Sequence, residues 1–228
     1  MRKTIAVTGA TVAAAAAITL SACSSSGSSH SSSMPSSHSM SGMTMSSAPT
    51  GSGTVQAGAP ASGPRNAADV AFATDMIPHH AQALAMAKMA LTKASNPKVK
   101  SLAQRIEAEQ IPEISLMSGW LKGWNKPVPD TSMGGMDMGG HNGGHSGGMG
   151  MPGMMSAADM AKLNAATGSA FDKLFLTEMI THHTGAVTMS HTELAQGQNG
   201  DAMSLAKSII AGQSKEITEM RALLPTIG

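Results

Sequence analysis

Two histidine doublets stand out in this chain, each inside a stretch of helix-forming residues. His79 and His80 lie in the segment DMIPHHAQALAM, and His182 and His183 lie 103 residues further along in EMITHHTGAVTM. A methionine precedes each doublet by the same interval. Imidazole nitrogen and thioether sulfur together favour copper, and the thioether favours Cu(I) in particular. The pattern therefore predicts copper ligands at matched positions of two helices.

The doublets belong to a longer internal repeat, which indicates that a whole unit was duplicated. Residues 69–91 match 172–194, and residues 102–117 match 205–220 at the same offset. One offset over two separate segments means that the loop between them kept its length. Besides the doublets, the matched side chains that could bind a metal ion are Asp69 with Asp172, Met76 with Met179, and Glu113 with Glu216.

Helix geometry limits which of these residues can share one ion. Adjacent histidines point in different directions on a helix, so each doublet offers one ring to the bundle interior and one to its edge. Met76 and His80 are one turn apart, about 6 Å along the axis, and can share an ion. Asp69 and His80 are about 16 Å apart along the axis and cannot share one within a single helix.

An antiparallel arrangement of the two matched helices would supply the missing carboxylates. We then expect Asp69 to approach His183 and Asp172 to approach His80, in two sites related by a pseudo-two-fold axis. A glutamate from the second helix of each unit would complete either site. The alternative is structural, because methionine at helical spacing usually fills a core and a histidine beside a carboxylate is often only a satisfied polar pair.

A second concentration of potential ligands lies between the two repeats. Residues 126–156 are rich in glycine, which neither a helix nor a strand accepts without cost. Thioether and imidazole groups in a segment with no core to fill favour capture of copper, and silver would be a mimic. These residues are Met133, Met136, Met138, His141, His145, Met149, Met151, Met154 and Met155.

Apolar periodicity predicts the helices that would position these residues, at 67–94, 98–122, about 157–195 and 201–224. Asn96-Pro97 ends the first helix and starts the second, and Asn199-Gly200 takes that place in the second unit. Pro112 should kink or split the second helix. One hairpin cannot bury its apolar stripe alone, but two can, so we expect an all-α four-helix bundle made of two duplicated hairpins.

The N-terminus predicts export and a lipid anchor. Residues 1–22 combine a basic start with an Ala-rich apolar stretch, as in a signal peptide. They lead into LSAC, which resembles the lipobox of bacterial lipoproteins and implies lipidation of Cys23, the only cysteine in the chain. We expect a protein anchored on the extracytoplasmic face of the cell membrane, with residues 23–66, rich in Ser, Gly, Met and His, as a flexible tether.

Charge and motifs exclude several classes of function. The formal net charge is +1 and no basic stripe is present, which argues against a nucleic-acid partner. The chain shows no nucleophile–base arrangement, no phosphate-binding glycine loop and no haem-attachment motif. A binding protein is therefore favoured over an enzyme.

The motif MIPHHAQALAMA, its second copy MITHHTGAVTMS, and the Q-x-x-E-I of residues 110–114 and 213–217 resemble the DUF305 family. The resemblance implies a ferritin-like bundle of paired hairpins and, from some members, copper binding outside the cytoplasm with a role in copper tolerance. The Glu-x-x-His pairs of ferritin-like di-iron sites are absent, which weakens an iron oxidase interpretation. By position, the resemblance implicates as metal ligands Met76, His79, His80, Met179, His182 and His183, with Asp69, Asp172, Glu113 and Glu216.

These expectations give one organisation and one leading function. The first hairpin would occupy residues 67–125, the Met/Gly/His-rich linker 126–156 and the second hairpin 157–228. The protein would sequester or buffer copper, as Cu(I), Cu(II) or both, and a homo-oligomer or a copper-accepting partner protein is compatible with this function. Two alternatives stay open, a ferritin-like metal oxidase and a non-catalytic interaction module whose polar core only fixes helix register.

Overall fold

The structure, a computed structural model, describes residues 61–131 and 150–228. These residues form four long helices and one short helix, and they contain no β-strand. The helices are α1 (Ala67–Lys93), α2 (Pro97–Gly123), α3 (Ala157–Ala165), α4 (Gly168–Gln196) and α5 (Gly200–Leu223), followed by a 3-10 turn at Leu224–Thr226. The predicted all-α class is confirmed.

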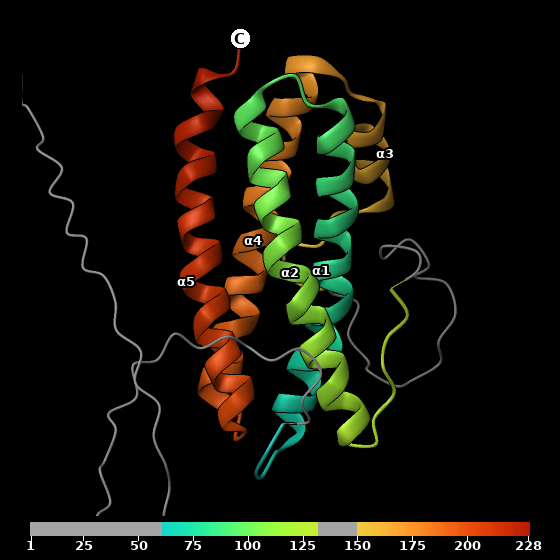
Figure 1. Ribbon diagram of the computed structural model, residues 1–228, viewed down its shortest axis with the longest axis vertical. Coiled ribbons are helices and arrows are strands. Elements are labelled where there is room, and N and C mark those ends of the chain that lie inside the picture. The colour runs from blue at the N-terminus through green and yellow to red at the C-terminus, as the bar shows by residue number, and fades with distance from the viewer. Residues whose placement is uncertain (1–60, 132–149) are drawn as a thin grey trace, which may run out of the picture. The chain divides into compact units, whose positions relative to one another are not determined.

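The four long helices form a bundle of two hairpins, as the repeat predicted. α1 packs on α2, α4 packs on α5, and the contact between α1 and α4 joins the hairpins. Figure 1 shows the four helices side by side, with the α1–α2 turn and the α4–α5 turn at opposite ends of the bundle. α1 and α4 run antiparallel. The side chain of Asn66, just before α1, accordingly donates a hydrogen bond to the carbonyl of Gln196 at the end of α4.

Asparagine caps the start of three of the long helices. Asn66 and Asp69 form a capping box at the start of α1. Asn96 caps α2 with Pro97 at the beginning of the helix, as predicted, and Asn199 caps α5 in the same way. The two hairpin turns are therefore built by the same residue at equivalent positions of the repeat.

Two details of the predicted helices are wrong. α2 runs through Pro112 without a break, so the predicted alternative of a split helix does not occur, and the packing of α2 on α1 outweighs the hydrogen bond that proline removes. The predicted helix at 157–195 is two helices, because the backbone is extended at Ala166 and Thr167. Gly168 then adopts a φ of 61°, which glycine accepts at little cost. Among the described residues, the first hairpin has no helix equivalent to α3.

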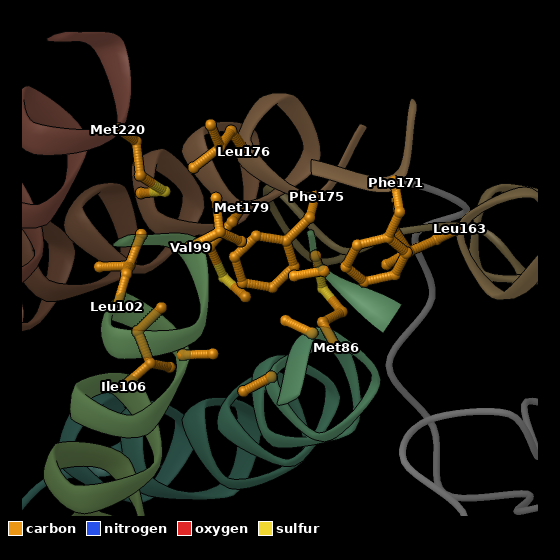
Figure 2. Packing of buried hydrophobic residues seen from close by; sticks show 14 of the residues in the cluster. Met86, Val99, Leu102, Ile106, Leu163, Phe171, Phe175, Leu176, Met179 and Met220 are labelled. Atoms are coloured by element: carbon orange, nitrogen blue, oxygen red, sulfur yellow. The ribbon is translucent and has the colours of Figure 1, made fainter. Parts of the chain in front are cut away.

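Apolar side chains from all five helices fill the interior, and Figure 2 shows one of the two core clusters. Phe171 and Phe175 stack there with ring centroids 6.0 Å apart. Met86 and Met220 lie in the same cluster with no exposed surface, so part of the methionine content serves as core packing. Among the described residues, no helix is both long and apolar enough to cross a membrane.

Candidate metal centre

One histidine of each doublet pairs with a glutamate of the second helix in its own hairpin. His80 Nε2 lies 2.7 Å from Glu113 Oε2, and His183 Nε2 lies 2.8 Å from Glu216 Oε2. Both imidazole rings have no exposed surface. The two pairs occupy equivalent positions of the repeat, so the duplication reproduces the same His–Glu pair on each side of a pseudo-two-fold axis.

The other histidine of each doublet meets its counterpart where α1 crosses α4. The rings of His79 and His182 lie with centroids 3.8 Å apart and planes tilted by 40°. His79 Nε2 donates to the backbone carbonyl of Pro152 at 3.0 Å, whereas neither ring nitrogen of His182 has a hydrogen-bond partner among the described residues. One ring of each doublet was predicted to face the edge of the bundle, yet all four rings are completely buried.

Burial keeps this central pair of histidines uncharged. Burial, with a smaller contribution from the neighbouring His80, lowers the pKa of His79 to about 3. Burial and the facing His79 ring hold the pKa of His182 well below its ordinary value. Both rings are therefore neutral at physiological pH, which is the form of histidine that binds a metal ion.

The hydrogen bonds also show which ring nitrogen is left without a partner. His79, His80 and His183 each donate through Nε2, because a backbone carbonyl or a carboxylate can only accept. In all three rings Nδ1 is buried without a hydrogen-bond partner among the described residues. A histidine that binds a metal ion through one ring nitrogen commonly donates a hydrogen bond from the other ring N–H to a carboxylate or a backbone carbonyl.

The two candidate methionine ligands lie one turn before the paired histidines and are completely buried. Met76 belongs to the core cluster that contains Trp120, and Met179 belongs to the cluster that contains Phe175. In residues 61–131 and 150–228, no three His, Cys, Asp or Glu side chains are grouped closely enough to hold a metal ion. A copper site in the bundle would therefore use thioethers, or two imidazoles alone, and both arrangements suit Cu(I) better than Zn²⁺.

The two aspartates do not approach the histidines, so that expectation is wrong. Asp172 accepts hydrogen bonds from Ser95 N and Oγ and from Asn96 N, in the turn of the other hairpin. Asp69 accepts at 2.9 and 2.8 Å from the backbone N–H groups of Gln198 and Asn199. The reason is register: α1 and α4 cross at the doublets themselves, so each aspartate, about 16 Å along its helix, lies at an end of the bundle.

Replacing Asp172 should therefore affect stability and leave copper binding unchanged. Asp172→Ala removes the acceptor of three hydrogen bonds, and we expect the free energy of unfolding in urea to fall by about 2–4 kcal/mol. Asp159→Ala is the matched control, because the Asp159 carboxylate accepts only from Ser156 and Lys162 at an exposed position, where such contacts stabilise little. A loss of copper affinity in Asp172→Ala without a loss of stability would restore the aspartate as a ligand.

Glu193, which the sequence interpretation missed, is buried beside Asp69 with 1% of its surface exposed. Burial and the neighbouring Asp69 carboxylate raise the pKa of Glu193 to about 8. Burial would also raise the pKa of Asp69, but backbone N–H groups, led by that of Asn66, outweigh it and lower this pKa. The repeat offered a signal, because the equivalent of Glu193 is Ala90 and the mismatch marks a residue with a separate role.

Only three of the predicted linker ligands lie within the described residues. Met155 is buried in the core, and Met151 and Met154 are half-buried. The others lie outside the described residues, as does Cys23: they are Met133, Met136, Met138, His141, His145 and Met149.

The sequence model of the family described as "Domain of unknown function (DUF305)" matches residues 69–224. The chain belongs to the DUF305 family. The match includes both histidine doublets and both glutamates that pair with them, so the candidate metal centre lies entirely within the DUF305 region. None of the functionally curated proteins matches the chain.

Solved structures of DUF305 proteins and of a protein named CopM share this fold. A DUF305 protein from Streptomyces coelicolor is 33% identical with a TM-score of 0.59, and covers 71% of this chain and 92% of its own. CopM in a Cu(I)-bound form is 31% identical with a TM-score of 0.55, over 69% of this chain and 96% of CopM. CopM in a Cu(II)-bound form is 34% identical with a TM-score of 0.56, over the same shares. CopM has also been solved with silver bound.

Proposed function

We propose that this DUF305 protein binds copper outside the cytoplasm and sequesters or buffers it. The observation that carries the proposal is the set of buried, neutral or carboxylate-paired imidazoles at the centre of the bundle. Three of them donate Nε2–H to an oxygen, and the buried Nδ1 of each has no hydrogen-bond partner among the described residues. A buried polar atom without a partner lowers the stability of the folded state by about 1–3 kcal/mol. Three such Nδ1 atoms near the centre of the bundle therefore favour a bound partner such as a metal ion.

The similarity to CopM supports copper as that ion. CopM has been solved with Cu(I), Cu(II) and silver bound, at 31–34% identity to this chain. Silver is a soft ion that mimics Cu(I), and the buried thioethers of Met76 and Met179 would favour both. We therefore propose Cu(I) as the preferred ion, held by Nδ1 of the doublet histidines with these two thioethers, while Glu113 and Glu216 orient His80 and His183.

The proposed location is the outer face of the membrane. The N-terminal segment resembles a lipoprotein signal peptide, so lipid on Cys23 would hold the bundle near the bilayer surface through residues 24–66. The Met/His-rich tether and linker would then capture ions and pass them to the bundle, which would hold them or transfer them to an accepting protein.

Removing the linker should lower the number of copper ions bound without unfolding the bundle. Deleting residues 133–149 removes Met133, Met136, Met138, His141, His145 and Met149, and leaves the described helices intact. We expect metal analysis after Cu(I) loading to show fewer ions per protein, with unchanged helicity by circular dichroism. An unchanged number of ions would assign all copper binding to the bundle.

The test of the function is a competition titration of the protein lacking residues 1–23 with Cu(I) and Cu(II), followed by metal analysis. We expect sub-picomolar affinity for Cu(I), because soft donors and neutral imidazoles are held in a buried site. Affinity no higher than that of a peptide covering residues 133–155 would contradict the proposal and favour an interaction module with a purely structural polar core. Oxygen uptake coupled to Cu(I) oxidation would instead indicate a metal oxidase.

A further inference from the structure

Residues 151–156, hereafter the strap, cover the central pair of histidines. The carbonyl of Pro152 accepts from His79 Nε2 at 3.0 Å. One residue later, Gly153 lies so close to α4 that a Cβ there would fall 2.9 Å from the backbone oxygen of His182. His79 and His182 have no exposed surface although they lie where the strap passes over α1 and α4. The strap therefore forms the outer wall of the pair.

A single glutamine holds the strap by both edges of its amide. Gln82 Nε2 donates to the carbonyl of Met155 at 3.0 Å, and Gln82 Oε1 accepts from Met155 N–H at 2.8 Å. Gln82 is 2% exposed, so both hydrogen bonds are shielded from water. Because Gln82 lies one turn from His79 on the same helix, this clamp fixes the strap directly beside the ring that Pro152 contacts.

The repeat shows that this clamp is a built feature of one hairpin. The equivalent of Gln82 in the second unit is Gly185. A Cβ at Gly185 would fall 2.0 Å from the carbonyl oxygen of Pro152, so only glycine leaves room for the strap on α4. The pseudo-two-fold axis would otherwise allow the strap to lie in two equivalent orientations. Gln82 on one helix and Gly185 on the other select one of them.

We propose that the strap controls how fast an ion leaves the central histidine pair, and that Gln82 is the positioning residue that keeps it closed. The inference rests on the proposed copper function and adds a route: the ion passes through the face that the strap covers. The strap continues directly from the Met/His-rich linker, so opening it would connect captured ions with the buried pair.

Two variants open the strap by independent means, and a third is a matched control. Gln82→Ala removes the clamp, and Gly185→Ala places a methyl group against Pro152 while Gln82 is kept. Gly212→Ala on α5 makes the same substitution inside a helix, where the added Cβ would lie in ordinary contact, 3.6 Å from Glu109. All three variants keep the doublet histidines and their glutamate partners.

The first measurement uses metal-free full chain and asks only whether the strap opens. We expect faster hydrogen–deuterium exchange at residues 151–158 in Gln82→Ala and Gly185→Ala, because the Met155 amide loses its buried acceptor or its position. Gly212→Ala should exchange like the parent. Unchanged exchange in both strap variants would overturn the inference, since neither residue would then hold the strap.

The second measurement follows transfer of Cu(I) from the loaded protein to an excess of a chromogenic Cu(I) chelator. We expect transfer about tenfold faster or more in both strap variants, with the same number of ions bound beforehand, and parent-like transfer in Gly212→Ala. If hydrogen exchange shows that the strap opens but transfer of Cu(I) is not faster, the strap does not control ion release. That outcome would overturn this inference and leave the proposed copper binding unaffected. A parent that binds no Cu(I) would overturn the proposed function itself, whatever the exchange data show.

Discussion

Replacing His80 and His183 with alanine should abolish tight copper binding by the bundle. Each substitution removes a candidate Nδ1 ligand from a completely buried position, and no other histidine of α1 or α4 can move there without unpacking the core. We expect the affinity for Cu(I) to fall by at least about 100-fold, since loss of an outer-shell partner alone costs a metal site about 10–100-fold. The measurement is the same competition titration, made on protein that lacks residues 133–149.

The carboxylate partners give a graded version of the same experiment. Glu113→Gln and Glu216→Gln keep a hydrogen-bond acceptor but remove the charge that orients His80 and His183, so affinity should fall by about 10–100-fold. His191→Ala is the control for the histidine variants, because His191 lies on α4 with an exposed side chain. Parent-like binding after loss of both His80 and His183 would restrict the site to His79 and His182.

Stability needs a separate check in the histidine variants. Glu113 and Glu216 have side chains only 16% and 6% exposed, and each would lose its buried partner. An unpaired buried acceptor costs about 1–3 kcal/mol, so the variants should unfold at lower urea concentration even without metal. Circular dichroism at the titration temperature distinguishes a folded variant without a site from an unfolded one.

Much of the fold followed from the sequence because the informative residues act locally. Asn96-Pro97 and Asn199-Gly200 mark helix starts by capping chemistry that depends on a few neighbouring residues. The repeat then implied two like hairpins, and apolar stripes implied their association. The break at Ala166 and Thr167 does have a local signal in Gly168 and Ser169, which are poor helix formers, but the apolar periodicity extended the predicted helix across it.

The candidate site depended on one quantity that the sequence does not contain, the level at which α1 crosses α4. Crossing at His79 and His182 brings the two central rings together and sends Asp69 and Asp172 to opposite ends of the bundle. A different register would have made the aspartates available to the histidines. The pairs of His80 with Glu113 and of His183 with Glu216 were easier to foresee, because both members lie in one hairpin and recur in the repeat.

The mismatches of the repeat turned out to be as informative as its matches. Gln82 against Gly185 marks where the strap lies, and Ala90 against Glu193 marks a buried acid. Duplication supplies two equivalent surfaces, but a single strap or a single buried proton can serve only one of them. Departures from symmetry at buried positions therefore indicate where the two hairpins acquired different tasks.

Glu193 makes the stability of the bundle depend on pH in an unusual direction for a carboxylic acid. Its pKa is about 8 in the folded protein and ordinarily 4.5, so the folded state keeps a proton that the unfolded state releases. The contribution of Glu193 to the free energy of unfolding is greatest below pH 4.5. It declines as pH rises towards 8 and is constant above that. Stabilisation by ordinary paired carboxylates, such as Asp69, changes in the opposite sense at lower pH.

Glu193→Gln should remove this decline, because a buried amide beside Asp69 does not ionise at any pH. We expect the variant to be more stable than the parent at pH 8.5 by roughly 1–3 kcal/mol, the cost of an unsatisfied buried group. The difference should shrink towards pH 5, as followed by urea unfolding across this range. Glu219→Gln is the control, since Glu219 is 42% exposed in a surface pair with Arg105 and should change little. A parallel pH dependence of parent and Glu193→Gln would mean that Glu193 ionises in the folded protein as it does in the unfolded chain.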